Sequence, residues 1–147
     1  MNNTTFEEEI QKTGKLIYTN RGTSMMPLLR QGRDLMIIER PPQGRCKKYD
    51  VPLYRWPGGE YVLHRILKVR KEDYVICGDH CWRKEYGITD QDIIGILTAV
   101  VRDGKTIPVT NFWYRCYAHL WCDFFWLRVG ILRLKYYISR IIRKQRP

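Results

Sequence analysis

Three short segments of this chain carry residue types from which a hydrolytic site can be built: a serine, a histidine and two acids. The first segment is the turn Gly22-Thr23-Ser24-Met25-Met26-Pro27, which lies between two β-like runs. A serine on a tight, glycine-containing turn can present its hydroxyl clear of a sheet, and backbone N–H groups beside it can stabilise an oxyanion. Such turns are common, so the motif alone is a weak signal. Ser24 is a candidate nucleophile that needs a base beside it.

The second segment is a β-like run around His64. Alternation along a strand places His64 on the same face as Val62 and Ile66. A neutral imidazole can take the proton of a serine hydroxyl, because the unperturbed pKa of histidine is about 6.5. An isolated histidine in a strand is more often a half-buried structural residue. We therefore expect His64 to act as a general base only if the fold brings it to Ser24.

The third segment ends in a glycine turn that carries Asp79, and Glu85 follows six residues later. A carboxylate that accepts a hydrogen bond from a catalytic histidine orients the imidazole and favours its protonated form. We favour Asp79 for this role, because Gly78 fixes its turn, whereas the longer Glu85 side chain must fold back to reach His64. The structural alternatives are a turn aspartate bonded to its own backbone and a solvated glutamate.

The order and spacing of these segments resemble those of the signal peptidase I-like and repressor-type serine peptidases. The nucleophile box of those families reads Gly-x-Ser-Met-x-Pro-x-Leu-x-x-Gly-x-Asp. Residues 22–34 of this chain match it, with Ser24 and Asp34 in the corresponding positions. The resemblance extends over about Leu16–Val101.

Two further boxes follow in the family order. The strand that bears the general base corresponds to His64-Arg65, and the Gly-Asp box with a following acid corresponds to Gly78-Asp79 and Glu85. The histidine resembles the base of endoplasmic-reticulum and archaeal-like signal peptidases, not the lysine of most bacterial ones. Glu85 stands where aspartate is more usual.

The resemblance implies a serine endopeptidase that cleaves a leader or signal-type peptide segment, with no cofactor and no metal ion. It also implies a mostly β fold, a small antiparallel sheet or incomplete barrel. The chain departs from the families because we find no N-terminal membrane anchor and no helix-turn-helix. The alternative function is a catalytically inactive relative that binds an extended peptide along a sheet edge.

The rest of the sequence indicates how these segments are held. Residues Phe6–Gly14 predict a short helix capped by Thr4 or Thr5. From Lys15 to about Gly104, short β-rich runs separated by turn signals predict the antiparallel sheet or incomplete barrel. The runs are LIYT, DLMIIE, DVPLYR, YVLHRILKV, DYVICG and IIGILTAVV. We assign residues 1–110 to a peptidase-like domain and residues 111–147 to a helical tail.

The tail holds most of the net charge of +11. Residues 113–147 contain 8 Lys and Arg against 1 Asp, whereas residues 1–112 contain 18 against 14 acids. We expect a helix broken near Gly130 whose last part is basic and amphipathic. Its nonpolar arc comprises Ile131, Leu134, Ile138, Ile141 and Ile142. The pattern is typical of an interfacial helix on an anionic membrane, and the alternative is that this arc packs on the protein's own sheet.

Other partners and locations follow from composition. With 44% nonpolar and 28% charged residues the chain should fold. Its longest uncharged stretches span nine residues, whereas a membrane span needs about 20. The N-terminus lacks the features of a signal peptide. We therefore expect a cytoplasmic protein, peripheral at the membrane surface, and we do not expect nucleic-acid binding, because no recognisable module is present.

The five cysteines, an odd number without any Cys-x-x-Cys pair, predict reduced thiols. A zinc site drawn from the cysteines and neighbouring histidines is disfavoured. Cys116, His119 and Cys122 are spaced so that they spread around a helix, and one ion cannot easily reach all three.

Overall fold

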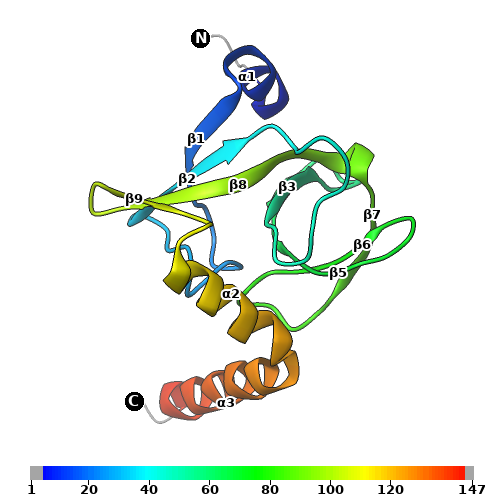
Figure 1. The fold of residues 1–147 in the computed structure, drawn as a ribbon. Helices are drawn as coiled ribbons and strands as arrows, with labels where there is room; N and C mark the ends of the chain where they lie inside the picture. Colours follow the sequence, from blue (N-terminus) through cyan, green and yellow to red (C-terminus); the bar gives the residue numbers. More distant parts are fainter. Residues whose placement is uncertain (1–4, 145–147) are drawn as a thin grey trace.

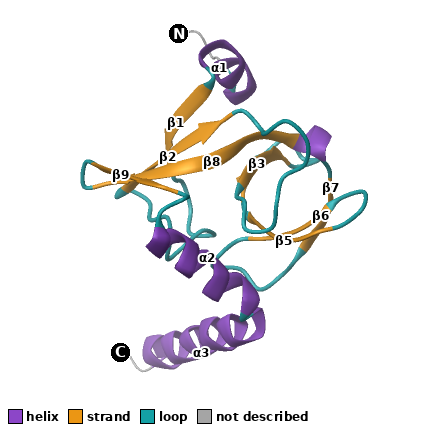
Figure 2. Cartoon of the chain, in the orientation of Figure 1, coloured by secondary structure: helices purple, strands orange, loops and turns teal. Residues whose placement is uncertain are grey.

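The computed structural model describes residues 5–144. Strands make up the body of the molecule, one short helix precedes them, and two helices follow them (Figure 1). The strands form two antiparallel sheets, and one of these is curled into half a barrel (Figure 2). The predicted class, a mostly β fold with an incomplete barrel, is confirmed.

The larger sheet is the curled one. Its strands are β1 (Lys15–Thr19), β2 (Asp34–Glu39), β3 (Pro52–Arg55), β4 (Tyr61–Leu63), β8 (Ile93–Arg102) and β9 (Lys105–Pro108). Their order is β1-β2-β8-β3-β4, and β9 pairs with the end of β8. Because the long strand β8 pairs with both β2 and β3, it holds the two halves of the sheet together. The edges of the path are β1 and β4.

The smaller sheet contains β5 (Arg65–Val69), β6 (Tyr74–Cys77) and β7 (Glu85–Ile88), with β6 in the middle. A 3-10 turn, η1 (Asp90–Asp92), then leads into β8. The run YVLHRILKV, expected to be one strand, is divided between the two sheets. The division falls at His64, because β4 pairs with β3 whereas β5 pairs with β6. His64 therefore sits at the crossing between the sheets.

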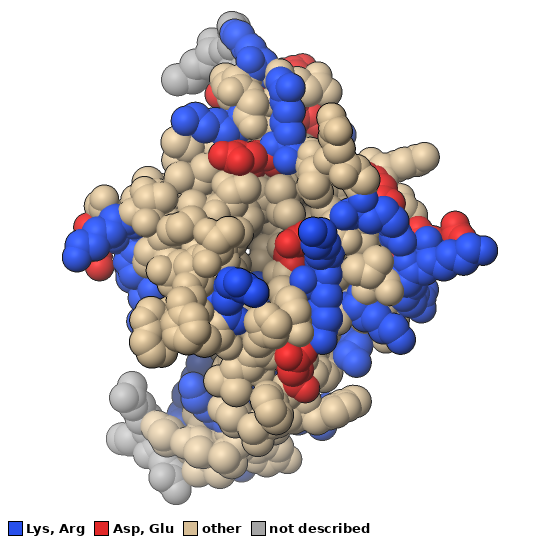
Figure 3. Space-filling model, viewed as in Figure 1, with Lys and Arg blue, Asp and Glu red and all other residues tan. Residues whose placement is uncertain are grey.

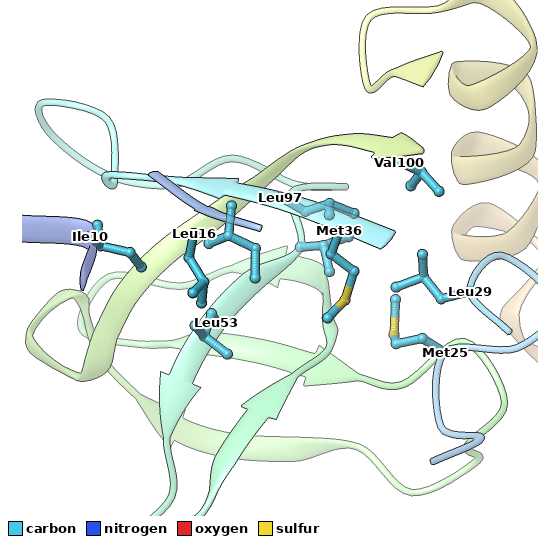
Figure 4. Close-up of a cluster of buried hydrophobic side chains, with 10 residues drawn as sticks. Ile10, Leu16, Met25, Leu29, Met36, Leu53, Leu97 and Val100 are labelled. Atoms are coloured by element: carbon cyan, nitrogen blue, oxygen red, sulfur yellow. The ribbon is translucent and has the colours of Figure 1, made fainter. Parts of the chain in front are cut away.

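The hydrophobic core lies within the curled sheet, and it includes the turn that follows Ser24 (Figure 4). Alternate residues of β2 and β8 face inward, as expected for strands with one buried face. Met25 and Leu29 are fully buried among them. Burial of each such side chain stabilises the fold by about 1.5–3 kcal/mol, so the turn that contains Ser24 is anchored by its own nonpolar residues. The buried members are Ile10, Leu16, Met25, Leu29, Met36, Ile38, Val51, Leu53, Leu97 and Val100.

The N-terminal helix α1 (Phe6–Thr13) confirms the predicted caps. Thr5 accepts a hydrogen bond from the Glu8 N–H while the Glu8 carboxylate accepts one from the Thr5 N–H. Gly14 ends the helix with a φ of 83°, a conformation that favours glycine.

The C-terminal tail forms two helices, α2 (Phe112–Asp123) and α3 (Phe125–Lys144). The break falls at Phe124, so the prediction of a break near Gly130 is wrong. A glycine inside a helix costs about 1 kcal/mol, and burial of Val129 and Leu132 on either side of Gly130 offsets that cost. The last part of the predicted tail, residues 145–147, lies outside the described residues.

The loop between β1 and β2 is closed by a buried carboxylate, that of Asp34. It accepts hydrogen bonds from the guanidinium groups of Arg33 and Arg102 and from the backbone N–H of Arg30. Arg102 also donates to the Leu28 carbonyl oxygen at 2.7 Å. Burial raises the pKa of the Asp34 carboxyl, but these hydrogen bonds outweigh it and lower the pKa to about 2.

We predict that Asp34→Asn lowers the free energy of unfolding at pH 7 by about 2–3 kcal/mol. A pKa of about 2 in the folded chain, against about 3.9 when unfolded, corresponds to roughly this amount. The stabilisation is complete above the unfolded-state pKa and is lost as the pH falls toward 2. Urea unfolding at several pH values between 7 and 3 measures it, with the exposed Asp103→Asn as the control. A loss at pH 7 no larger than that of the control would contradict this role.

Candidate active site

Ser24 and His64, predicted from segments far apart in the sequence, line one cavity of about 520 Å³. Its other walls come mainly from β1, from β4 and from the loop after β1. The cavity thus lies between the two edge strands of the curled sheet. A larger cavity, about 750 Å³, lies beside α1 and the β3–β4 turn, and none of the predicted site residues lines it.

Gly78 is the point at which the Ser24 main chain and the His64 ring meet. A Cβ atom at Gly78 would lie 2.7 Å from the Ser24 carbonyl oxygen and 3.0 Å from His64 Cδ2, so only glycine permits this approach. The His80 N–H donates to the same Ser24 carbonyl oxygen at 2.7 Å. The Cδ2 atom of the His64 ring and the carbonyl oxygen of Ser24 therefore both lie beside Gly78.

The other side of the His64 ring contacts a carboxylate. Nδ1 lies 3.0 Å from Glu85 Oε1 and 3.4 Å from the Tyr54 hydroxyl, which itself donates to Glu85. Burial raises the pKa of Glu85, but the hydrogen bonds from His64 and Tyr54 outweigh it and hold the pKa below its ordinary value. An ionised Glu85 accepts a hydrogen bond from the Nδ1–H group of His64. Nε2 is then the ring nitrogen that can accept a proton. Among residues 5–144 the ring hydrogen bonds are these two, so none joins it to the Ser24 hydroxyl.

Asp79 contacts Arg65 instead of His64. The Arg65 Nε and Nη2 atoms donate to the two Asp79 oxygens at 2.9 and 2.8 Å, and both side chains are fully buried. This corrects the expectation that Asp79 orients the imidazole, because Glu85 takes that position. The physical reason is that Arg65 points away from its neighbour His64 into the interior, where a buried cation needs a counterion. Strand alternation places Arg65 on the face opposite His64, but it does not show that Arg65 is buried.

Helix α2 covers this ion pair. The sequence analysis did not predict this contact. The Tyr117 hydroxyl donates to Asp79 Oδ2 at 2.8 Å, and the Trp121 indole N–H donates to the Asp79 carbonyl oxygen at 2.6 Å. The rings of Tyr114 and Tyr117 lie 5.7 and 5.6 Å from the Arg65 guanidinium carbon. Burial raises the pKa of the Tyr117 hydroxyl, so it remains a donor. The many aromatic residues of α2 were the sequence feature that could have indicated a helix packed on the domain.

Helix α3 contacts the same turn through Arg128, another residue that sequence reasoning missed. Its Nη2 donates to the carbonyl oxygens of Gly78 and Cys81 at 3.1 and 2.9 Å. The Arg128 side chain is buried and lies over the Phe125 ring. Both tail helices therefore donate hydrogen bonds to the turn that begins at Gly78.

The Cys77 thiol, which lies in the strand before the Gly78 turn, is fully buried. Burial raises the pKa of the Cys77 thiol to about 12, so it stays protonated at neutral pH. Cys116 is exposed on α2, whereas Cys122 of the same helix is buried. Across the part of the chain that the structure describes, no group of three or more His, Cys, Asp or Glu is arranged to hold a metal ion.

Comparisons of the chain with protein-family models, with curated proteins and with solved structures found no match.

We predict that Asp79 and Glu85 differ in what their loss does to the fold. Asp79→Asn leaves the buried Arg65 cation without a counterion, which costs about 3–5 kcal/mol of unfolding free energy. Glu85→Gln keeps a hydrogen-bonding side chain at a partly exposed position and should cost less than about 1.5 kcal/mol. Urea unfolding of both variants at pH 7 tests this. Equal losses, or a larger loss for Glu85→Gln, would contradict the assigned roles.

Proposed function

We propose that this chain is a serine endopeptidase in which Ser24 is the nucleophile, His64 the general base and Glu85 the acid that orients it. The observation that carries the proposal is the position of the imidazole. Its Nδ1 atom contacts Glu85, and its Cδ2 atom lies beside Gly78, which also adjoins the Ser24 carbonyl oxygen. A serine and a base that line one cavity are what nucleophilic hydrolysis requires.

The proposed reaction follows the serine–histidine pattern. Ser24 Oγ attacks the carbonyl carbon of the scissile bond while its proton passes to His64 Nε2. The imidazolium, stabilised by Glu85, then gives this proton to the departing amine as the C–N bond breaks. Water attacks the acyl-enzyme in the same way, with its proton taken by Nε2, and releases the acid and the free Ser24 hydroxyl.

Backbone amides are available for the oxyanion of the tetrahedral intermediate. The N–H groups of Ser24 and Met25 donate to no acceptor within residues 5–144. Two amides beside a nucleophile can supply the stabilisation that oxyanion holes provide. Gly22 begins this turn with a φ of 88°, which favours glycine at that position.

The sheet edges support an extended peptide as the substrate. Within the described residues, β1 pairs only with β2 and β4 pairs only with β3, so each leaves backbone groups open on its outer side. Residues of both strands, among them Tyr18, Thr19 and Val62, line the cavity of Ser24. An extended segment can pair with such an edge as an added strand. A leader or signal-type peptide segment has this form.

One observation favours the second candidate function, a catalytically inactive peptide-binding protein. The Ser24 hydroxyl has no hydrogen bond to His64 among the described residues. Hydrogen bonds of this kind often form only when substrate is bound. Binding with no cleavage of any bound peptide would favour the inactive protein.

We predict that Ser24→Ala, His64→Ala and the double variant lower peptide hydrolysis by a similar factor, at least about 10³-fold. Residues that act as one unit are not additive, so the double change should add little. His64→Lys should also be inactive near neutrality, because an unshifted lysine stays protonated there. Mass spectrometry of a peptide library before and after incubation measures cleavage. Ser139→Ala and His119→Ala, which lie on the tail helices, are the controls. Full activity of Ser24→Ala would contradict the proposal.

We further predict how activity depends on pH. A histidine base works only when neutral, so the rate should rise between about pH 6 and 7. Glu85 has a lowered pKa and is ionised over this range, where it favours the protonated imidazole. In Glu85→Gln the maximal rate should fall, and the acid limb should move to lower pH, because a neutral amide no longer favours the protonated imidazole. Rates of hydrolysis from pH 5 to about pH 9 test this, with the exposed Glu72→Gln as control. An acid limb that stays in place would contradict the contact.

A further inference from the structure

The second tail helix presents a nonpolar stripe that faces away from the domain. The residues of this stripe, which we call the outer stripe, are 40–62% exposed. They are Leu127, Ile131, Leu134, Ile138, Ile141 and Ile142. The residues of α3 that are buried on the domain are Phe125, Arg128, Val129 and Leu132. At about 100° per residue the two sets have their centres roughly half a turn apart on the helix.

This placement decides between the two alternatives that the sequence left open. The nonpolar arc of the tail does not pack on the protein's own sheet, because the side chains that do so come from the opposite side of α3. A soluble helix normally turns its nonpolar side to the core, so an exposed stripe on a folded domain indicates a surface for a partner.

Basic side chains border the outer stripe. Arg133, Arg140 and Lys144 lie along one side of it and Lys135 along the other, and all four are exposed. The region over α3 is mostly uncharged in the space-filling view, with Lys and Arg at its margins (Figure 3). The single acid of the tail, Asp123, is already paired with Lys48 at 2.6 Å. The surface is therefore nonpolar in the middle and positive at its borders.

Exposed aromatic side chains add to this surface. On α3, Trp126 is 77% exposed and Tyr137 is 66% exposed. Tryptophan and tyrosine are enriched where proteins meet the boundary between lipid chains and headgroups, because their rings are nonpolar and their N–H or O–H groups are polar.

We propose that the outer stripe of α3, with its basic borders, docks the protein on the surface of an anionic lipid bilayer. The helix lies in the plane of the interface, with the stripe against the acyl chains and the basic groups among the phosphates. Within residues 5–144 no helix combines the length and hydrophobicity that a membrane crossing needs. A second copy of the chain fits less well, because it would bring two positive borders together.

Docking would also bring the candidate active site to the bilayer. The inner side of the same helix contacts the Gly78 turn through Arg128. The docking itself does not depend on hydrolysis, and lipid binding can be measured without any substrate.

Flotation of the purified full chain with vesicles tests the proposal. We expect recovery with phosphatidylcholine vesicles that contain about one third phosphatidylglycerol, and little recovery with phosphatidylcholine alone. Raising the salt from about 0.1 M to about 1 M should weaken binding, because it screens the basic groups. Absence of the protein from the anionic vesicle fraction at low salt would overturn the proposal, as would equal recovery with neutral vesicles.

Two pairs of substitutions separate the stripe from its borders. Ile138→Gln with Ile141→Gln should lower the vesicle partition coefficient about tenfold, and glutamine preserves the helix. Arg140→Gln with Lys144→Gln should lower it about 25-fold on anionic vesicles, at about fivefold for each charge. The matched controls are Ile17→Thr with Val69→Thr and Lys71→Gln with Lys105→Gln, which remove exposed nonpolar or basic side chains on strands or turns of the β domain. Unchanged binding of both tail pairs would overturn the proposal.

Analytical ultracentrifugation of the same proteins tests whether a second copy of the chain covers the outer stripe instead. A wild-type dimer that becomes a monomer in the Ile138→Gln, Ile141→Gln protein, without vesicle binding by either, would show that the face joins two copies and would overturn the proposal. A monomer that floats with anionic vesicles supports it. Circular dichroism confirms that each variant keeps its helices before the comparison is made.

Discussion

The buried ion pair between Arg65 and Asp79 is the interaction on which the rest of the site depends. Arg65 directly follows His64 at the crossing between the two sheets, and Asp79 directly follows Gly78, which touches both the His64 ring and the Ser24 main chain. The pair therefore holds the start of β5, next to His64, and the turn at Gly78 together. Neither charge is tolerable in the interior without the other. Helix α2 completes the arrangement by covering the pair and donating hydrogen bonds to Asp79.

Three of the acids in the matched motifs make different contacts in the fold. Asp34 closes the loop that contains the nucleophile turn, and its pKa of about 2 reflects the hydrogen bonds that it accepts. Asp79 neutralises a buried arginine. Glu85 alone faces the imidazole, and its lowered pKa keeps it ionised at neutral pH. The matching of acids to motif positions could not distinguish these contacts, because all three acids lie next to basic residues in the sequence or in space.

The sequence predicted the fold class and the caps of α1, because turn chemistry and β-branched runs are local signals. It pointed to Ser24 and His64 through the order and spacing of the motifs that contain them. It did not predict β7, which carries Glu85, because that strand is short and polar and contains Gly87 with a φ of 81°. The sequence also predicted one strand where the structure has two, β4 and β5, on either side of His64. Tertiary contacts decide that β4 pairs with β3 and that β5 pairs with β6. The preference for Asp79 failed for the same reason: the burial of Arg65 is a property of the fold.

The proposed activation of Ser24 by His64 is tested by reaction of the folded chain with an alkyl fluorophosphonate, followed by intact mass measurement and peptide mapping. We expect one adduct per chain, on Ser24, which forms much more slowly in the His64→Ala protein. If the folded protein is not labelled, or if His64→Ala leaves the labelling rate unchanged, His64 does not activate Ser24.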